Sequence, residues 1–202
     1  MIELRAKDNT TDHVRTVYGV GYNSGNKHKR TIGGVSTPIY KTWNDMLRRC
    51  YSSKFQDKYP TYKGCTVCDE WHNFQVFAEW FDSYPYKKTG YHLDKDILVK
   101  DNKEYSPDNC CIVPQEVNKL LCGRGSAKKL YPQGVYFDSA KKRFVAGLKI
   151  DSKQVRLGVF KNPDDAYDCY RKYKTEHIRS KALMWTGHLE ERVILALMNW
   201  SL

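Results

Sequence analysis

The spacing of apolar residues changes along the chain, and each kind of spacing predicts a different element. In the segments 38–53 and 73–84, apolar residues recur every three or four positions, which is the period of a helix with one buried face. The positions that would face the core are Ile39, Trp43, Met46, Leu47, Cys50, Phe74, Phe77, Ala78 and Phe81. Both segments are therefore expected to be core-forming helices.

In the last third of the chain the pattern shortens to that of β-strands. Three runs of apolar and β-branched residues are separated by polar turns, which predicts three short strands. The predicted strands are 133–139, 143–150 and 154–160. A helix over 162–182 should follow, because Asn162 can cap it and Pro163 suits its first position. An amphipathic helix is expected over 188–200.

The stretch from Leu93 to Asn118, LDKDILVKDNKEYSPDNCCIVPQEVN, combines acids, a lysine and two short apolar runs. We expect a strand over 89–98 and a second strand over 110–114, separated by a polar loop with Ser-Pro and Asp-Asn turn chemistry. A helix should begin near Pro114. The predicted order is strand, loop, strand and helix.

Such a unit can place side chains from a strand end and from a helix around one cation. Mg²⁺ keeps several waters in proteins and needs only one or two carboxylates plus the phosphate of a substrate. Asp94 and Asp96 would share a strand face with His92, because strand side chains alternate. We expect one or both acids to bind Mg²⁺ or a similar divalent cation. The alternative is that Asp94, Lys95 and Asp96 form a solvated, salt-bridged strand end.

The same stretch resembles the HNH (ββα-metal) endonucleases, in particular the free-standing phage and intron-homing types. The resemblance rests on SPDNCCIVP and PQEVN, and segments between residues 17 and 121 also resemble the N-terminal region of one group of phage-encoded HNH-type proteins. It implies that Asn109 holds the loop by hydrogen bonds and that Asn118 is a metal ligand.

The general base of such a centre stays open. Asp94-Lys95-Asp96 stands where the family has its histidine. Lys95 would need a strongly lowered pKa, which two flanking acids oppose, so a contact to phosphate is its other candidate role. His92 is the alternative base.

The cysteines offer a second candidate metal site. Seven cysteines, an odd number without a secretory signal, do not favour a disulfide framework. Cys65 and Cys68 have the spacing of metal ligands, and Cys110 could add a third, with Cys50 or His72 completing the set. A structural Zn²⁺ would fit such a set, as in some HNH proteins. Buried thiols in a reduced core are the favoured interpretation.

The segment 131–175 resembles the AP2 DNA-binding domain. The matching motifs are Gly134-Val135, Phe144-Val145-Ala146, Arg156-Leu157-Gly158-Val159-Phe160 and Ala166-Tyr167. The resemblance implies a three-stranded antiparallel sheet that enters the major groove, with a helix packed behind it. The plant members of the family use more Arg and Trp on this sheet, so their target sequence does not carry over.

The resemblance also implies which side chains would meet DNA. The outward set would be Gln133, Tyr136, Asp138, Lys149, Gln154 and Arg156. The hairpin residues Lys141, Lys142 and Arg143 would lie by phosphates, with a solvated charge as the alternative for each lysine. Arg156 is the best candidate for a bidentate guanine contact, worth about 1–3 kcal/mol of discrimination.

Composition agrees with a polyanionic partner. The net charge is +11, from 34 Lys and Arg against 23 Asp and Glu, which favours nucleic acid over a merely basic surface. The mean hydropathy is −0.70, and no apolar run approaches the roughly 20 residues that span a bilayer, so no membrane partner is expected. The N-terminal segment has no apolar signal core, which predicts the cytoplasm of the host cell.

The sequence therefore predicts an α+β protein: an HNH-like module with helical N-terminal elements over 1–124, an AP2-like domain over 125–182 and an amphipathic helix over 183–202. The predicted function is a phage-encoded, metal-dependent endonuclease that cleaves or nicks double-stranded DNA without a small-molecule cofactor. The alternative is a non-catalytic, sequence-specific DNA-binding protein on a degenerate HNH shell, with RNA binding as a third candidate. Monomer or homodimer stays open.

Overall fold

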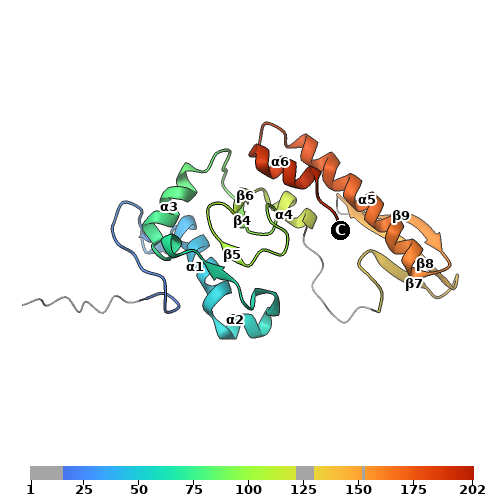
Figure 1. The fold of residues 1–202 in the computed structure, drawn as a ribbon, viewed down its shortest axis with the longest axis horizontal. Coiled ribbons are helices and arrows are strands. Elements are labelled where there is room, and N and C mark those ends of the chain that lie inside the picture. Colours follow the sequence, from blue (N-terminus) through green and yellow to red (C-terminus); the bar gives the residue numbers. More distant parts are fainter. Residues whose placement is uncertain (1–15, 122–129, 152) are drawn as a thin grey trace, which may run out of the picture. The chain divides into compact units, whose positions relative to one another are not determined.

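The computed structural model forms two compact units (Figure 1). The residues it describes are 16–121, 130–151 and 153–202. Of the described residues, the first unit contains 16–83 together with Lys103–Pro107. The second unit contains Tyr84–Asn102 and Asp108–Leu202. The expected domain boundary after residue 124 lies outside the described residues.

Two helices build the core of the first unit. α1 (Pro38–Tyr51) is capped by Thr37, whose hydroxyl accepts the backbone N–H of Tyr40, and α3 (Phe74–Ser83) packs against α1. The buried side chains of the two helices are Trp43, Met46, Leu47, Cys50, Phe74, Phe77, Ala78 and Phe81. The helical faces predicted from the apolar spacing are confirmed, except that Ile39 is only half-buried.

Short elements complete the first unit. They are β1 (Thr31–Ile32), β2 (Val35–Ser36), α2 (Ser53–Lys58), η1 (Pro60–Tyr62), β3 (Thr66–Val67), η2 (Asp69–His72) and β5 (Glu104–Tyr105). β3 and β5 pair in parallel, so Lys103–Pro107 belongs to this unit although its neighbours in the sequence belong to the second. The indole N–H of Trp43 donates to the carbonyl of Trp71 at 2.7 Å.

The second unit begins with a strand pair and a short helix. β4 (His92–Asp94) and β6 (Cys111–Val113) are antiparallel, and α4 (Gln115–Leu121) follows β6 and contacts β4. The predicted order of strand, loop, strand and helix is therefore present. The first strand is much shorter than expected, because the chain bends directly after Asp94.

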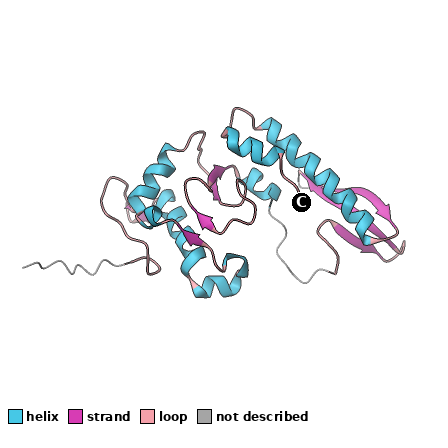
Figure 2. Ribbon diagram, in the orientation of Figure 1, coloured by secondary structure: helices cyan, strands magenta, loops and turns pink. Residues whose placement is uncertain are grey.

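The second unit also contains a three-stranded antiparallel sheet and a long helix (Figure 2). The strands are β7 (Val135–Asp138), β8 (Arg143–Ile150) and β9 (Lys153–Phe160), in that order across the sheet. α5 (Pro163–Met184) contacts all three strands. The three strands and the helix that the sequence predicted are thus confirmed.

The contact between α5 and the sheet is a small apolar core. Ala146 and Leu148 of β8 pack with Ala166 and Tyr170 of α5. The amide oxygen of Asn162 caps the helix by accepting the N–H of Asp165 at 2.8 Å. Tyr173 of α5 lies outside this core and is 45% exposed, whereas the next residue, Lys174, is buried.

The last helix, α6 (Glu191–Met198), joins the parts of the second unit. It contacts α5, and its guanidinium group at Arg192 donates to the carbonyls of Asp108 and Cys110 just before β6. The hydroxyl of Tyr84 donates to the carboxylate of Glu190, next to the start of the helix. The C-terminal helix therefore packs on its own unit.

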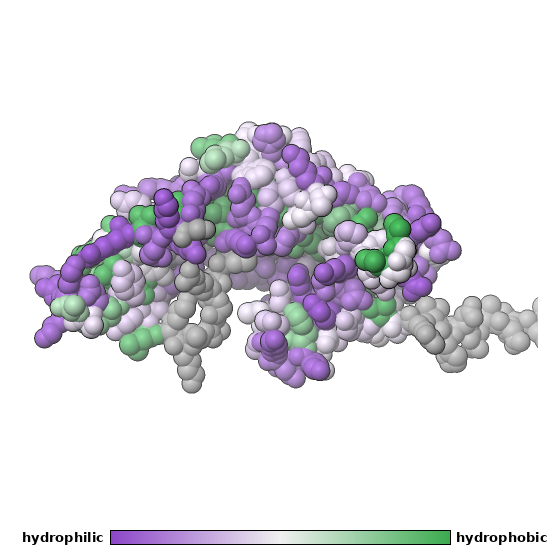
Figure 3. Space-filling view, turned by 180° about the vertical axis from the view of Figure 1, so that it is seen from behind, coloured by the Kyte–Doolittle hydropathy of each residue, from purple (hydrophilic) through white to green (hydrophobic). Residues whose placement is uncertain are grey.

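These elements make the protein a mixed α+β protein, as the sequence predicted. Hydrophilic side chains dominate the surface over the sheet and α5, seen from behind on the left of Figure 3. Within the described ranges, no helix has both the length and the apolar character that crossing a bilayer requires.

Candidate nucleic-acid interface and metal site

Asp94 organises the turn that ends β4. Its Oδ1 accepts the backbone N–H groups of Asp96 at 2.8 Å and of Ile97 at 2.9 Å. A side chain that caps its own turn in this way offers the backbone an alternative to the strand ladder. This explains why the strand stops at Asp94 and why Asp96 lies in a bend rather than on the strand face that it was expected to share with Asp94.

The carboxyl of Asp94 lies in a largely desolvated place. Burial raises its pKa, the two backbone hydrogen bonds lower it, and the net shift is upward from its ordinary value of 3.8. The charge of Asp96 also raises the pKa of Asp94, and the charge of Lys95 lowers it. A nearby cation would stabilise the ionised form of a carboxyl group held in this environment, because a positive charge favours the carboxylate.

Lys95 points into the loop that follows β4 and is buried, with 6% of its surface exposed. Its ammonium group donates to Oδ1 of Asp96 and to the carbonyl of Asn102, both at 2.5 Å. The amide of Asn102 donates back to the carbonyl of Lys95 at 3.0 Å. Lys95 therefore orders the loop, and this position differs from the solvent-facing one that a contact to phosphate needs.

The other residues of the predicted cleavage site lie on the same strand–loop–strand–helix unit. His92 is exposed on β4, two residues before Asp94 and opposite Val113 of β6. Asn109 is half-buried in the turn before β6. Asn118 is half-buried on α4, which contacts β4. The fold thus brings the strand with His92 and Asp94 against the helix with Asn118.

The cysteines proposed for zinc are divided between the two units. Cys65 and Cys68 belong to the first unit and Cys110 to the second. Burial raises the pKa of the Cys68 thiol to about 11, and a hydrogen bond with Glu70 acts in the same direction. Across the ranges that the structure describes, there is no group of three or more His, Cys, Asp or Glu side chains arranged to hold a metal.

Strand pairing sorts the side chains of the sheet between two faces. Directly opposite residues share a face, and the pairs Val135–Ala146 and Phe144–Phe160 face α5. The alternate positions form the outer face, whose polar residues are Tyr136, Asp138, Arg143, Lys149, Gln154 and Arg156, and which also contains Val145, Gly147 and Val159. Five of the six residues that were expected to point outward are in this set. Gln133 lies just before β7.

Glycine at position 147 shapes the middle of the outer face. Gly147 is the cross-strand partner of Arg156, next to an irregularity in the pairing of β8 and β9. A Cβ at Gly147 would lie 2.5 Å from Nε2 of Gln154 and 3.4 Å from Cε1 of Tyr136. The Gln154 amide and the Tyr136 ring therefore lie over the glycine, and Arg156 is exposed beside them.

The end of the outer face is a basic turn between β7 and β8. Lys141, Lys142 and Arg143 are all exposed there. Asp138 accepts the backbone N–H groups of Ala140 and Lys141 at 3.1 Å, so its carboxylate holds the turn in shape. The turn presents three cations in a fixed backbone conformation. Asp138 shapes this turn, whereas the resemblance to AP2 domains implied that it would point outward and meet DNA.

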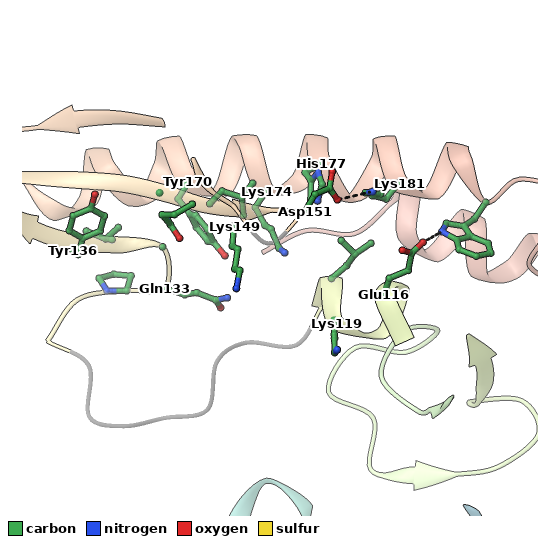
Figure 4. Close-up of a pocket in the computed structure, with 18 residues that line it drawn as sticks. Glu116, Lys119, Gln133, Tyr136, Lys149, Asp151, Tyr170, Lys174, His177 and Lys181 are labelled. Carbon is green, nitrogen blue, oxygen red and sulfur yellow. Dashed lines mark hydrogen bonds and ion pairs between the residues drawn. The ribbon is translucent and has the colours of Figure 1, made fainter. Parts of the chain in front are cut away.

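A cleft of about 750 Å³ in the second unit was missed by reasoning from the sequence. It lies beside the edge of β8 that the short β7 leaves uncovered, and α4 and α5 form its other walls (Figure 4). The charged and imidazole groups that line it are Glu116, Lys119, Lys149, Asp151, Lys174, His177 and Lys181. One signal was available: Lys174, His177 and Lys181 recur at helical spacing on α5.

Comparisons of the chain with protein-family models, with curated proteins and with solved structures find no match.

Proposed function

We propose that the protein is a metal-dependent endonuclease that binds double-stranded DNA through the outer face of its sheet and cuts a strand at the unit of β4, β6 and α4. The observation that carries this proposal is the position of Asp94. The strand that ends in this partly desolvated carboxylate is paired with β6 and contacted by α4, which carries Asn118.

The donor set fits a hydrated divalent cation. Mg²⁺ in proteins is often held by one or two carboxylates while it keeps several waters. Asp94 and Asn118 would hold it, and Asp96 is engaged by the ammonium group of Lys95. When bound, the cation would supply positive charge to the phosphate oxygens and the leaving oxygen of the DNA strand.

Side chains of the protein would remove the proton of the attacking water and hold the carboxylate of Asp94 in position. His92 is exposed on the same strand as Asp94, so its imidazole would take the proton of the attacking water. Lys95 holds the loop after β4 through Asp96 and Asn102 and would keep the carboxylate of Asp94 in position. We assign Lys95 this positioning role instead of a direct contact to phosphate.

The outer face supports the DNA-binding half of the proposal. It presents Arg156, Gln154 and Lys149 side by side on neighbouring strands, and these side chain types read base edges in a major groove. The three cations of the basic turn at 141–143 suit phosphates, which position a protein on the duplex without reading sequence. The net charge of +11 favours the same partner.

A second candidate is a DNA-binding protein that does not cut. The observation that favours it is the structural use of the acidic strand end: Asp94 caps a turn and Lys95 fills a loop. Both roles would remain in a protein that had lost its nuclease activity.

Incubation of supercoiled plasmid with the full chain separates the two candidates. Nicking in Mg²⁺ or Mn²⁺ that EDTA abolishes, and that Asp94→Asn and Asn118→Ala remove, would support the nuclease. Asp101→Asn is the matched control, because Asp101 is an exposed acid with φ of 59° in the same loop and Asn tolerates that conformation. Retention of plasmid with no cutting in any metal would favour the non-catalytic protein.

A further inference from the structure

The cleft beside β8 collects positive charge from three separate elements. Lys119 comes from α4, Lys149 from β8, and Lys174 and Lys181 from α5. Figure 4 shows side chains from these elements around one space, with Lys149 and Gln133 directed into it from the sheet side.

The two carboxylates of the cleft already have partners. Asp151 accepts from the ammonium group of Lys181 at 3.4 Å, and Glu116 accepts the indole N–H of Trp185 at 2.9 Å. No ion pair to a carboxylate joins Lys119 or Lys149 within the described part of the chain. The four lysines therefore exceed the acids that face them.

One of these lysines is buried. Lys174 has only 9% of its surface exposed, although it lines the cleft. Its ammonium group has an interaction partner within the protein, and its charge adds to the positive charge of the cleft.

The cleft is continuous with the outer face of the sheet. Tyr136, Lys149 and Gln154 belong to both, and Gly147 lies between them. A DNA strand that lay on the outer face would meet the cleft at the uncovered edge of β8. The volume of about 750 Å³ is within the range of about 300–1,000 Å³ that small ligands occupy, so one nucleotide fits.

We propose that this cleft binds a single nucleotide through its phosphate, which Lys119, Lys149, Lys174 and Lys181 surround. Gln133, Gln154 and Tyr136 line the cleft on the side of the sheet, where a base would be held. The nucleotide is either part of a DNA strand or free, and the ligand chemistry is the same. The strand source rests on the proposed function, because it requires DNA on the outer face.

His177 supplies a local reporter for this site. Burial and the charges of Lys174 and Lys181 lower its pKa, and Asp151 opposes them. The other charged groups of the cleft are Glu116 and Lys119 on α4 and Lys149 on β8. A bound phosphate would stabilise the imidazolium form, so the pKa of His177 should rise when the cleft is filled. A His177→Asn variant identifies its resonance in NMR spectra.

Calorimetric titration of the full chain with three probes tests the proposal: inorganic phosphate, deoxyadenosine monophosphate and a single-stranded hexanucleotide. We expect Lys119→Gln and Lys149→Gln each to weaken binding of the nucleotide probes about fivefold, as expected for loss of a charge-assisted contact. Lys161→Gln is the matched control, since Lys161 is exposed in the same unit outside the cleft, and it should change affinity less than twofold.

The three probes show whether the nucleotide that binds in the cleft is part of a DNA strand or free. Tighter binding of the hexanucleotide than of the monophosphate supports a DNA strand as the ligand, and equal binding of these two supports a free nucleotide. Equal affinity for inorganic phosphate and the monophosphate would overturn nucleotide binding. Equal effects of Lys119→Gln and Lys161→Gln, or an unchanged pKa of His177 in the presence of the monophosphate, would overturn the assignment of the cleft.

The experiments distinguish an error in the assignment of the nucleotide-binding cleft from an error in the proposed function. Duplex binding that depends on Arg156, together with nucleotide binding that is indifferent to Lys119, removes the cleft alone. Nucleotide binding that depends on Lys119, in a chain that neither holds nor cuts duplex DNA, removes the proposed function alone.

Discussion

Arg156 of β9 is the cross-strand partner of Gly147 of β8, at the point where the pairing of these strands becomes irregular. Because Gly147 has no side chain, the amide of Gln154 and the ring of Tyr136 can lie over the backbone there. The exposed guanidinium of Arg156 therefore lies beside a shallow, polar centre of the outer face rather than beside a bulky neighbour.

Arg156 should carry sequence preference. Arg156→Ala removes a fork of donors suited to a guanine edge, so binding to a preferred duplex should weaken about tenfold or more, while binding to unrelated duplex changes little. Fluorescence anisotropy in EDTA, on a preferred site selected from a random duplex library and on a scrambled duplex, measures both affinities. Equal losses on the two duplexes would mean that Arg156 meets only phosphate.

Replacement of Gly147 should weaken DNA binding while lowering the stability of the fold only slightly. In Gly147→Ala the new methyl displaces the end of the Gln154 side chain, which is flexible, so the free energy of unfolding should fall by less than about 1 kcal/mol. The preferred duplex should still be bound several-fold more weakly, because the amide of Gln154 is moved. Urea unfolding and anisotropy on the same preparation test the two statements, and an unchanged duplex affinity would argue against a role for this part of the outer face.

Gly134 should be essential to the fold of the sheet and helix. It has φ of 80°, and a Cβ there would lie 2.0 Å from Cδ2 of the buried Tyr170 ring. Gly134→Ala should destabilise the protein by about 3 kcal/mol or more, from backbone strain together with overpacking.

Gly90→Ala is the control for the strain alone. Gly90 has φ of 85° and open space around it, so the expected loss is only about 1 kcal/mol. Chemical denaturation followed by circular dichroism gives both values. Similar losses for the two variants would show that Tyr170 does not pack against Gly134.

Asp94 should give folding stability a characteristic pH dependence. Burial raises its pKa in the folded state above the ordinary value of 3.8, so the folded protein binds this proton more tightly than the unfolded chain. Stability from this group is therefore highest at low pH and falls as the pH rises from about 3.8 through the raised pKa.

Asp94→Asn keeps the acceptor for the N–H groups of Asp96 and Ile97 but removes the ionisation. Its unfolding temperature, relative to that of the unaltered chain, should rise as the pH increases from about 3 to 7. Asp94→Ala also loses the cap and should be about 1 kcal/mol less stable than Asp94→Asn at any pH. A constant difference between Asp94→Asn and the unaltered chain over this range would contradict the raised pKa.

Local patterning was enough to predict most of the elements. The buried stripes of α1 and α3 and the three strands with their capped helix follow from side chain periodicity and from Asn162 and Pro163. Because these elements bury one face each, the spacing of apolar residues is decided by the same packing that holds them in place.

The candidate site was harder to predict, because its side chains hydrogen-bond locally. The sequence pattern could not reveal that Asp94 would cap its own turn or that Lys95 would turn inward to Asn102. Both outcomes depend on where the loop after β4 closes. Likewise, the cleft depends on how far β7 extends along β8, which no motif encodes.

The most direct test of the account is the binding of Mn²⁺, followed by electron paramagnetic resonance, to the full chain without DNA. We expect one ion per chain, loss of that ion in Asp94→Asn and in Asn118→Ala, and retention in Asp101→Asn, since only the first two remove ligands. Equal Mn²⁺ binding by all four proteins, or none by the unaltered chain, would contradict a shared cation between the end of β4 and α4.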